Sequence, residues 1–215
     1  MKKFAVILSG CGSMDGSEIH EAVMTLLAID RNECSYTIFA PDKPQRSVVN
    51  HATKENMEES RNMLVEAARI ARGDIHPINK YDPAQFDALV FPGGFGAAKN
   101  LFSYAYDGAQ ATVDPDIAKI IKETHKLRKP IGALCIAPVL LACVLHNITI
   151  TVGTDRHTIS DVEQMGATHI NTNQTEVIAD KENMIFSTPC YMLPATIADI
   201  ADSAENLIEA ILENI

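Results

Sequence analysis

Hydrophobic and polar residues follow two patterns that alternate along the chain. Short apolar runs rich in β-branched residues predict strands, and the longer amphipathic stretches between them predict helices. The predicted strands span residues 4–9, 35–40, 88–91, 131–134, 149–152 and 184–187. The predicted helices span residues 17–29, 55–71, 115–127, 137–145, 159–165 and 195–212.

Strands separated by helices form βαβ units, so the pattern predicts an α/β fold with a mostly parallel sheet and helices on both faces. The runs 4–9, 88–91 and 131–134 are apolar throughout, as expected for central strands buried on both sides. We find no linker, repeat or low-complexity segment, so residues 1–215 are expected to form a single domain. The stretch 41–87 is long for one crossover, and we expect it to hold an inserted helix and an irregular return.

Composition and charge narrow the class of protein. Hydrophobic residues make up 47% and charged residues 21%, as in ordinary globular proteins, and the net charge of −10 disfavours binding to nucleic acid. No apolar run approaches the roughly 18 residues of a membrane span, and the run 4–8 is too short for a secretory signal core. Five cysteines without a CxxC pair fit reduced thiols. We therefore expect a cytoplasmic protein that contacts neither nucleic acid nor membrane.

Cys135 is the strongest candidate for a catalytic residue. Ligands of parallel sheets bind beyond the carboxyl ends of the strands, and Cys135 lies directly between a buried strand and a helix that opens with Ile136 and Pro138. This strand–cysteine–helix turn is typical of a nucleophile elbow, where the helix N-terminus is expected to stabilise a thiolate. The alternative is a small buried thiol with a packing role.

A glycine-rich segment follows the strand 88–91. Gly93, Gly94 and Phe95 are predicted to bind substrate, since unobstructed amides there, together with the amide of Ile136, could hold an oxyanion formed by attack on a carbonyl. A tight turn between strand and helix is the alternative interpretation.

Glu18 is the candidate acidic partner. It lies at the start of the first predicted helix, and it could act as a general base or share a proton with the cysteine if both face the same crevice. The spacing from Asp15 to Glu18 also fits a helix capping box. His20 and Glu21 follow closely and are possible accessory residues.

Two other motifs carry alternatives. Cys11 and Cys190 also follow strands, and with the elbow cysteine and Glu18 they could bind a soft metal. The favoured interpretation is that these two cysteines are small residues that fill the corners of loops. The segment 10–16, GCGSMDG, imitates a dinucleotide fingerprint with Asp42 as the ribose ligand. Its acidic neighbours would repel a pyrophosphate, so no nucleotide cofactor is predicted. No metal is predicted either.

Taken together, these segments resemble PfpI-type proteins of the class I glutamine amidotransferase-like superfamily, and most closely the ElbB group of isoprenoid-biosynthesis glyoxalases. The resemblance rests on segments spread over nearly the whole chain: ILSGCG…DGSEIHEAV (7–23), FAPDK (39–43), EAARIARG (66–73), PGGFGAAKNL (92–101), KPIGALCIAP (129–138) and TPCYM (188–192). It implies a flavodoxin-like three-layer α/β/α sandwich, a homodimer, Cys135 as the nucleophile and Glu18 as its acidic partner.

The resemblance implies a glyoxalase that converts glyoxal or methylglyoxal to glycolate or lactate without glutathione or any other cofactor. No histidine follows His169, and Ile136 stands where PfpI-type proteases have histidine, so glutaminase and protease chemistry are disfavoured. Two alternatives remain open. One is a redox sensor or binding protein that uses the cysteine, and the other is a glutaminase-like subunit that acts with a partner.

Overall fold

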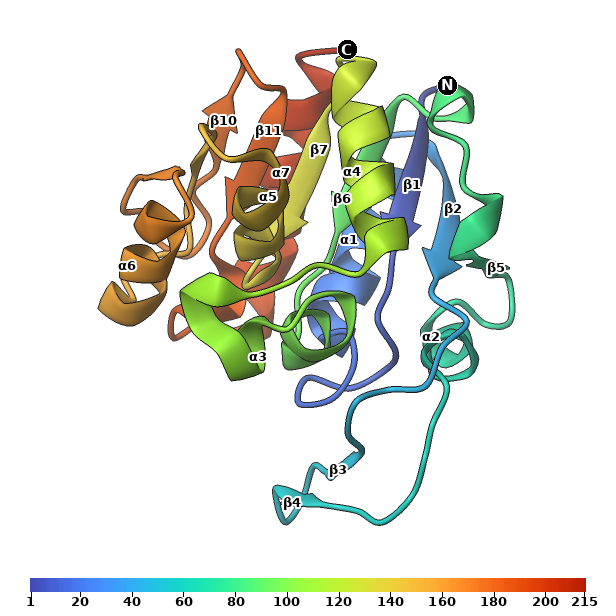
Figure 1. Cartoon of the computed structure of the whole chain (residues 1–215). Coiled ribbons are helices and arrows are strands. Elements are labelled where there is room, and N and C mark those ends of the chain that lie inside the picture. The colour runs from blue at the N-terminus through green and yellow to red at the C-terminus, as the bar shows by residue number, and fades with distance from the viewer.

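A seven-stranded sheet forms the centre of the molecule (Figure 1). In the computed structural model of residues 1–215, the strand order is β10-β11-β7-β6-β1-β2-β5, and every neighbouring pair is parallel except β10 with β11. The strands are Lys3–Ile7 (β1), Ser35–Ala40 (β2), His76–Pro77 (β5), Ala88–Phe91 (β6), Ile131–Leu134 (β7), Ile178–Asp180 (β10) and Ile185–Thr188 (β11). This arrangement confirms the predicted α/β fold of flavodoxin-like type.

Helices cover both faces of this sheet. Figure 1 shows α4 and α5 in front of the strands and α1 and α7 behind them. The helices are Ile19–Arg31 (α1), Met63–Ile70 (α2), Tyr104–Asp107 (α3), Pro115–Lys126 (α4), Ala137–Leu145 (α5), Arg156–Gln164 (α6) and Ile197–Leu212 (α7). Short helical turns occupy Ile78–Lys80, Pro83–Gln85, Ala97–Leu101, Gly108–Gln110 and Cys190–Met192. None of the helices has both the length and the apolar composition that crossing a membrane requires.

Two small strand pairs lie outside the main sheet. Val49–Asn50 (β3) and Glu55–Asn56 (β4) form an antiparallel hairpin that projects from the body of the molecule, and Thr149–Ile150 (β8) pairs in parallel with Thr168–His169 (β9). The predicted strand 149–152 is therefore shorter than expected and separate from the main sheet. Its continuation breaks because the amide of Thr151 donates to the Ser187 hydroxyl instead of a ladder partner.

Local sequence signals account for most helix boundaries. Asp114 caps α4 by accepting the amide of Asp116, and Pro115 occupies the first turn, as predicted. The predicted helix 55–71 is wrong over its first half, and only Met63–Ile70 is helical. The preceding residues 51–60 are all exposed and have no apolar face that packs against the core. The helix therefore begins only after Asn62, which caps its N-terminus.

The most buried strands of the sheet end at the edge where the candidate functional residues lie. The residues of β6 and β7 are all buried, and those of β1 are buried after its first residue. These three strands run in the same direction, so the loops that follow them meet at one edge, shown at the bottom of Figure 1.

Candidate active site

Cys135 lies at a sharp turn between β7 and α5. Its backbone has φ of +60°, a conformation uncommon for residues other than glycine, and its amide donates to the Thr188 carbonyl at 3.0 Å. Strain of this kind is a property of nucleophile elbows. The side chain is 8% exposed and lines a cavity of about 610 Å³, so the sulfur is shielded from bulk water but faces an open space.

Glu21 is the acidic residue that contacts this cysteine. It lies in the first turn of α1, is completely buried, and its carboxyl group lies against the side chain of Cys135. The amide of Gly93 donates to Glu21 Oε2 at 3.0 Å, and the amide of Tyr191 approaches Oε1 at 3.4 Å. Loops from three strands therefore hold one carboxyl group against one thiol.

Gly93 makes this contact possible because it has no side chain. A Cβ atom at this position would lie 2.6 Å from Cys135 Cβ and 2.6 Å from Glu21 Oε2. Separations that short do not occur between real Cβ atoms and their neighbours. The glycine thus lets the two reactive groups approach each other across the loop after β6.

Both members of the pair bind protons more tightly than usual. Burial, reinforced by the charge of Glu18, raises the pKa of Glu21 to about 8. Burial also raises the pKa of the Cys135 thiol well above its ordinary range, and the amide of Gly94 opposes this effect. The expectation that Cys135 is held as a thiolate is therefore wrong, because burial and the neighbouring Glu21 both raise the pKa of its thiol.

Glu18 lies at the start of the first helix, as predicted, but its carboxyl group is used as a helix cap. It is the N-cap of α1, and its Oε2 accepts the amide of Glu21 at 2.8 Å. The side chain lines the same cavity as Cys135. The role of contacting the sulfur passes from Glu18 to Glu21, which the sequence marked only as an accessory residue.

The predicted oxyanion site is reduced to two amides. The amide of Gly93 is engaged by Glu21, and that of Phe95 donates to the Ser13 carbonyl at 2.7 Å, so neither is free to bind substrate. The amide of Gly94 faces the sulfur of the elbow cysteine. The amide of Ile136 has no acceptor within the chain, as is usual in the first turn of a helix.

The cavity lining also contains His157, a residue for which the sequence predicts no role. His157 Nε2 lies 3.7 Å from Asp161 Oδ2, and the Tyr104 hydroxyl donates to the same oxygen at 2.8 Å. The predicted helix began at residue 159, whereas α6 begins at Arg156, capped by Asp155. The capping signal of Asp155, followed by a histidine in the first turn, would have revealed this position.

The remaining accessory candidates differ in how they are placed relative to Cys135 and the cavity. Cys190 is fully buried, and its thiol interacts with the backbone of Cys135. His20 is exposed on α1, and its Nδ1 lies 2.8 Å from the hydroxyl of Tyr191, a residue of the cavity wall. Cys11 is half-buried, and burial, together with the charges of Glu66 and Asp15, raises its pKa. No group of three or more histidine, cysteine or acidic side chains is arranged to hold a metal ion.

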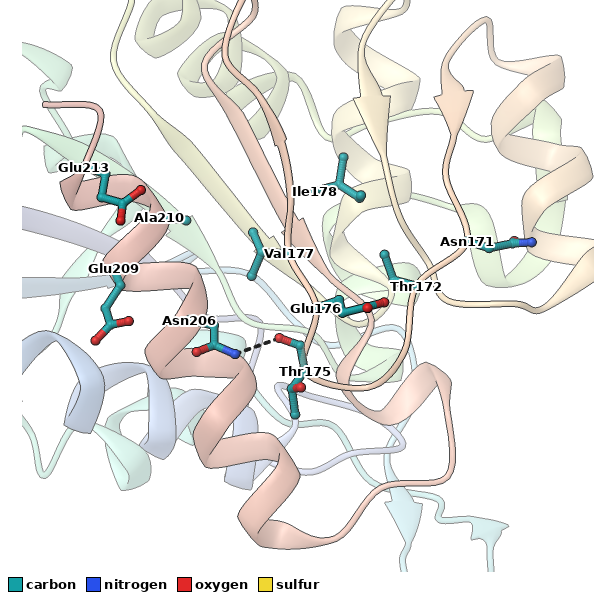
Figure 2. A pocket seen from close by; sticks show the side chains of 10 residues that line it. All are labelled: Asn171, Thr172, Thr175, Glu176, Val177, Ile178, Asn206, Glu209, Ala210 and Glu213. Atoms are coloured by element: carbon teal, nitrogen blue, oxygen red, sulfur yellow. Dashed lines mark hydrogen bonds between the residues drawn. The ribbon is translucent and has the colours of Figure 1, made fainter.

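A second hollow of about 610 Å³ lies between α7 and the segment around β10 (Figure 2). Figure 2 shows Glu209 and Glu213 on α7, with Asn206 donating to the Thr175 carbonyl at 2.9 Å. Its lining has neither cysteine nor histidine and includes none of the predicted site residues. The cavity at the elbow is therefore the candidate active site.

Comparisons with known proteins give the family of the chain. The sequence matches the model of the DJ-1/PfpI family over residues 11–195. It is 41% identical to the mitochondrial ES1 protein homolog of Rattus norvegicus, covering 98% of this chain and 83% of the relative. It is 40% identical to the mitochondrial glutamine amidotransferase-like class 1 domain-containing protein 3 of Homo sapiens, covering 98% and 82%.

The names of these two relatives contradict the expectation of a cytoplasmic protein, since both are mitochondrial. That expectation rested on the absence of a secretory signal core, and this test does not separate the cytosol from mitochondria.

A solved structure gives the same assignment. The isoprenoid biosynthesis protein with an amidotransferase-like domain from Ehrlichia chaffeensis superposes with a TM-score of 0.92 and 36% identity, covering 99% of this chain and all of that chain. Sequence and fold thus agree over essentially the full length. The chain belongs to the DJ-1/PfpI family.

Proposed function

We propose that this protein is a glyoxalase-like enzyme that converts glyoxal or methylglyoxal to glycolate or lactate without glutathione. The observation that carries the proposal is the buried contact between Cys135 and Glu21, beside a cavity whose lining includes Cys135, Gly94 and Ile136. A nucleophile, a proton carrier and two hydrogen-bond donors are the groups that addition to an aldehyde requires.

The first step is addition of sulfur to the aldehyde. Glu21 as carboxylate takes the thiol proton of Cys135 while the sulfur attacks the carbonyl carbon, and the amides of Gly94 and Ile136 stabilise the resulting oxyanion. Glu21 then returns the proton to this oxygen and forms a neutral hemithioacetal.

The second step moves hydrogen between the two carbons of the substrate. Glu21 removes the proton from the carbon bonded to sulfur while the neighbouring carbonyl oxygen gains a proton, which gives an enediol. Glu21 then delivers its proton to the neighbouring carbon as the hydroxyl on the sulfur-bearing carbon loses its own proton, which leaves an α-hydroxy thioester on Cys135. Water hydrolyses this thioester, releases the hydroxy acid and restores the thiol. The sum is dicarbonyl plus water to hydroxy acid, so no external oxidant or reductant is consumed.

A consumption assay with glyoxal and methylglyoxal, without glutathione, tests the proposal. We expect Cys135→Ala to lower kcat/KM by about 10³-fold or more, because the covalent intermediate cannot form. Cys143→Ala is the matched control: this thiol lies on α5 and donates to the Ala111 carbonyl, away from the cavity. Equal activity in wild type and Cys135→Ala would reject the proposed function.

A second comparison separates the two acidic residues. Glu21→Gln should lower kcat/KM by about 10²-fold to 10⁴-fold, the usual contribution of a positioned general base, whereas Glu18→Gln should stay within about 10-fold of wild type. Circular dichroism of both variants checks that α1 is intact. A larger loss in Glu18→Gln than in Glu21→Gln would return the proton-transfer role to Glu18.

The pH dependence of the reaction follows from the raised pKa of Glu21. The carboxylate form is the base, so the active fraction increases as the pH rises through about 8. We expect kcat/KM for methylglyoxal to increase from pH 6.5 to pH 8.5 in the wild type. A profile that is flat or falls across this interval contradicts Glu21 as the base.

Burial of Cys135 weighs against the alternative of a redox sensor. Peroxides react with thiolates, and desolvation disfavours the thiolate here. The homodimer and the independence from cofactors stay predictions of the sequence, and the molar mass in solution tests the first.

A further inference from the structure

The cavity at the elbow is much larger than the substrates of the proposed reaction. Its volume of about 610 Å³ lies within the range of roughly 300–1,000 Å³ that holds drug-sized ligands. A three-carbon dicarbonyl has the bulk of only a few water molecules, each of about 30 Å³ in the liquid. Such a substrate would leave most of the cavity filled with water, which is a poor arrangement for positioning it.

Much of the cavity lining is aromatic. The rings come from three separate segments, and Met192 adds a flexible apolar side chain beside them. The aromatic lining residues are Phe95, Tyr104, Tyr106 and Tyr191. Phe95 and Tyr106 are 53% and 58% exposed, which is high for such large apolar groups. A ring of a bound ligand would cover these surfaces and gain both burial and aromatic contacts.

The charged groups that line the cavity are mostly acidic. Glu18, Asp155 and Asp161 are among the lining residues, whereas His157 is the sole basic side chain and no lysine or arginine is present. Hydrogen bonds from Thr158 lower the pKa of Asp155, so this group is ionised at neutral pH.

Lys99 lies near the cavity but does not line it. Its Nζ is 5.6 Å from the centre of the Phe95 ring and donates to the Met14 carbonyl at 2.9 Å and to the Ser47 hydroxyl at 3.3 Å, so the ammonium group is directed at these oxygens and not at a carboxylate of the wall. The wall therefore disfavours ligands that carry a carboxylate, phosphate or diphosphate.

We propose that the substrate class of this site is an α-oxoaldehyde with an aromatic or similarly bulky group that is uncharged or cationic. The inference rests on the proposed function and deepens it. The dicarbonyl end lies at Cys135, and the ring lies among the exposed aromatic residues, where a cationic substituent also gains from the acidic groups and the ring faces. Anionic tails of the same size are rejected.

Kinetics with a graded set of substrates tests this inference. The set is methylglyoxal, phenylglyoxal, and phenylglyoxals with a para-trimethylammonium or a para-carboxylate group. We expect kcat/KM for phenylglyoxal to exceed that for methylglyoxal by about 10-fold or more, as buried apolar groups of this size contribute. The cationic compound should exceed the carboxylate by about 10-fold at low salt, with a smaller ratio in 0.5 M NaCl.

A pair of charge variants locates the origin of this discrimination. Asp161→Asn should reduce the ratio between the cationic and carboxylate substrates. Glu209→Gln removes the same charge from the second hollow and should leave the ratio unchanged. If both variants change the ratio equally, the overall charge of −10 rather than the cavity wall sets the preference.

Binding to the inactive protein keeps this inference separate from the proposed function. Acetophenones with the same para substituents are offered to Cys135→Ala, and their dissociation constants are measured by calorimetry. Tighter binding of the cationic and uncharged ketones supports the inference even if no dicarbonyl is consumed, a result that would reject the glyoxalase activity alone. Equal or tighter binding of the carboxylate overturns the inference whatever the activity.

Discussion

Glu21→Gln should make the folded protein more stable at pH 8 and above, even though it removes a residue of the active site. The pKa of Glu21 rises from 4.5 to about 8 on folding. Between these values the native protein retains a proton that the unfolded chain has released, so the free energy of unfolding falls as the pH rises. The full penalty is about 5 kcal/mol above pH 8, and an amide, which does not ionise, avoids it.

Urea denaturation of the wild type and Glu21→Gln from pH 5 to pH 9 measures this effect. The difference in free energy of unfolding should grow across the series, because the amide can accept from Gly93 and donate toward the sulfur as the protonated carboxyl does. Glu18→Gln, three residues earlier at the helix start, should keep most of the slope of the wild type, because burial is a larger cause of the raised pKa of Glu21 than the charge of Glu18. A constant difference between wild type and Glu21→Gln would show that Glu21 ionises normally in the fold.

Gly94→Ala should be severely destabilising, by about 3 kcal/mol or more. A Cβ atom there would lie 2.3 Å from the amide nitrogen of Glu18 and 2.5 Å from the Gly16 carbonyl oxygen, and backbone atoms cannot move aside as a flexible side chain does. The positive φ of +105° adds strain for any residue with a side chain. The variant should have a lower midpoint of denaturation and, where it folds, reduced activity.

Gly73→Ala is the control that separates these two causes. Gly73 also has a positive φ, +86°, but nothing lies within 4 Å of the position of its Cβ. Its replacement should cost only about 1 kcal/mol, the usual strain of alanine in this conformation. If the two variants lose equal stability, backbone strain rather than the close approach of the two loops explains the need for glycine at position 94.

The central strands and the elbow could be predicted from the sequence because their signals are local. The segment Ile131–Leu134 is wholly apolar, and a cysteine, an isoleucine and a proline-containing helix follow it in order, so pattern alone indicates the turn. The same holds for α4, whose cap and proline are adjacent residues. The start of α2 could not be predicted, because the polar residues before Met63 differ little in helix propensity from those after it.

The choice between Glu18 and Glu21 depends on contacts between distant segments. The two residues are three positions apart and share one side of a helix, so periodicity does not distinguish them. Their difference arises because Gly93, far along the chain, leaves room for Glu21 and donates to it, while Glu18 is used as the helix cap. For His157 the two kinds of signal differ: the cap at Asp155 indicates where α6 begins, but the position of the histidine at the cavity depends on the packing of the complete fold.

The raised pKa of the Cys135 thiol has a consequence for chemical labelling. Alkylating reagents consume thiolates, and Cys11, Cys34 and Cys143 are more accessible than the two buried cysteines. Near neutral pH, iodoacetamide should therefore modify peripheral sulfurs before the one at the elbow. The stoichiometry of labelling then says little about whether Cys135 is blocked, and ligands of this site are better built around an electrophilic carbonyl that fills the cavity.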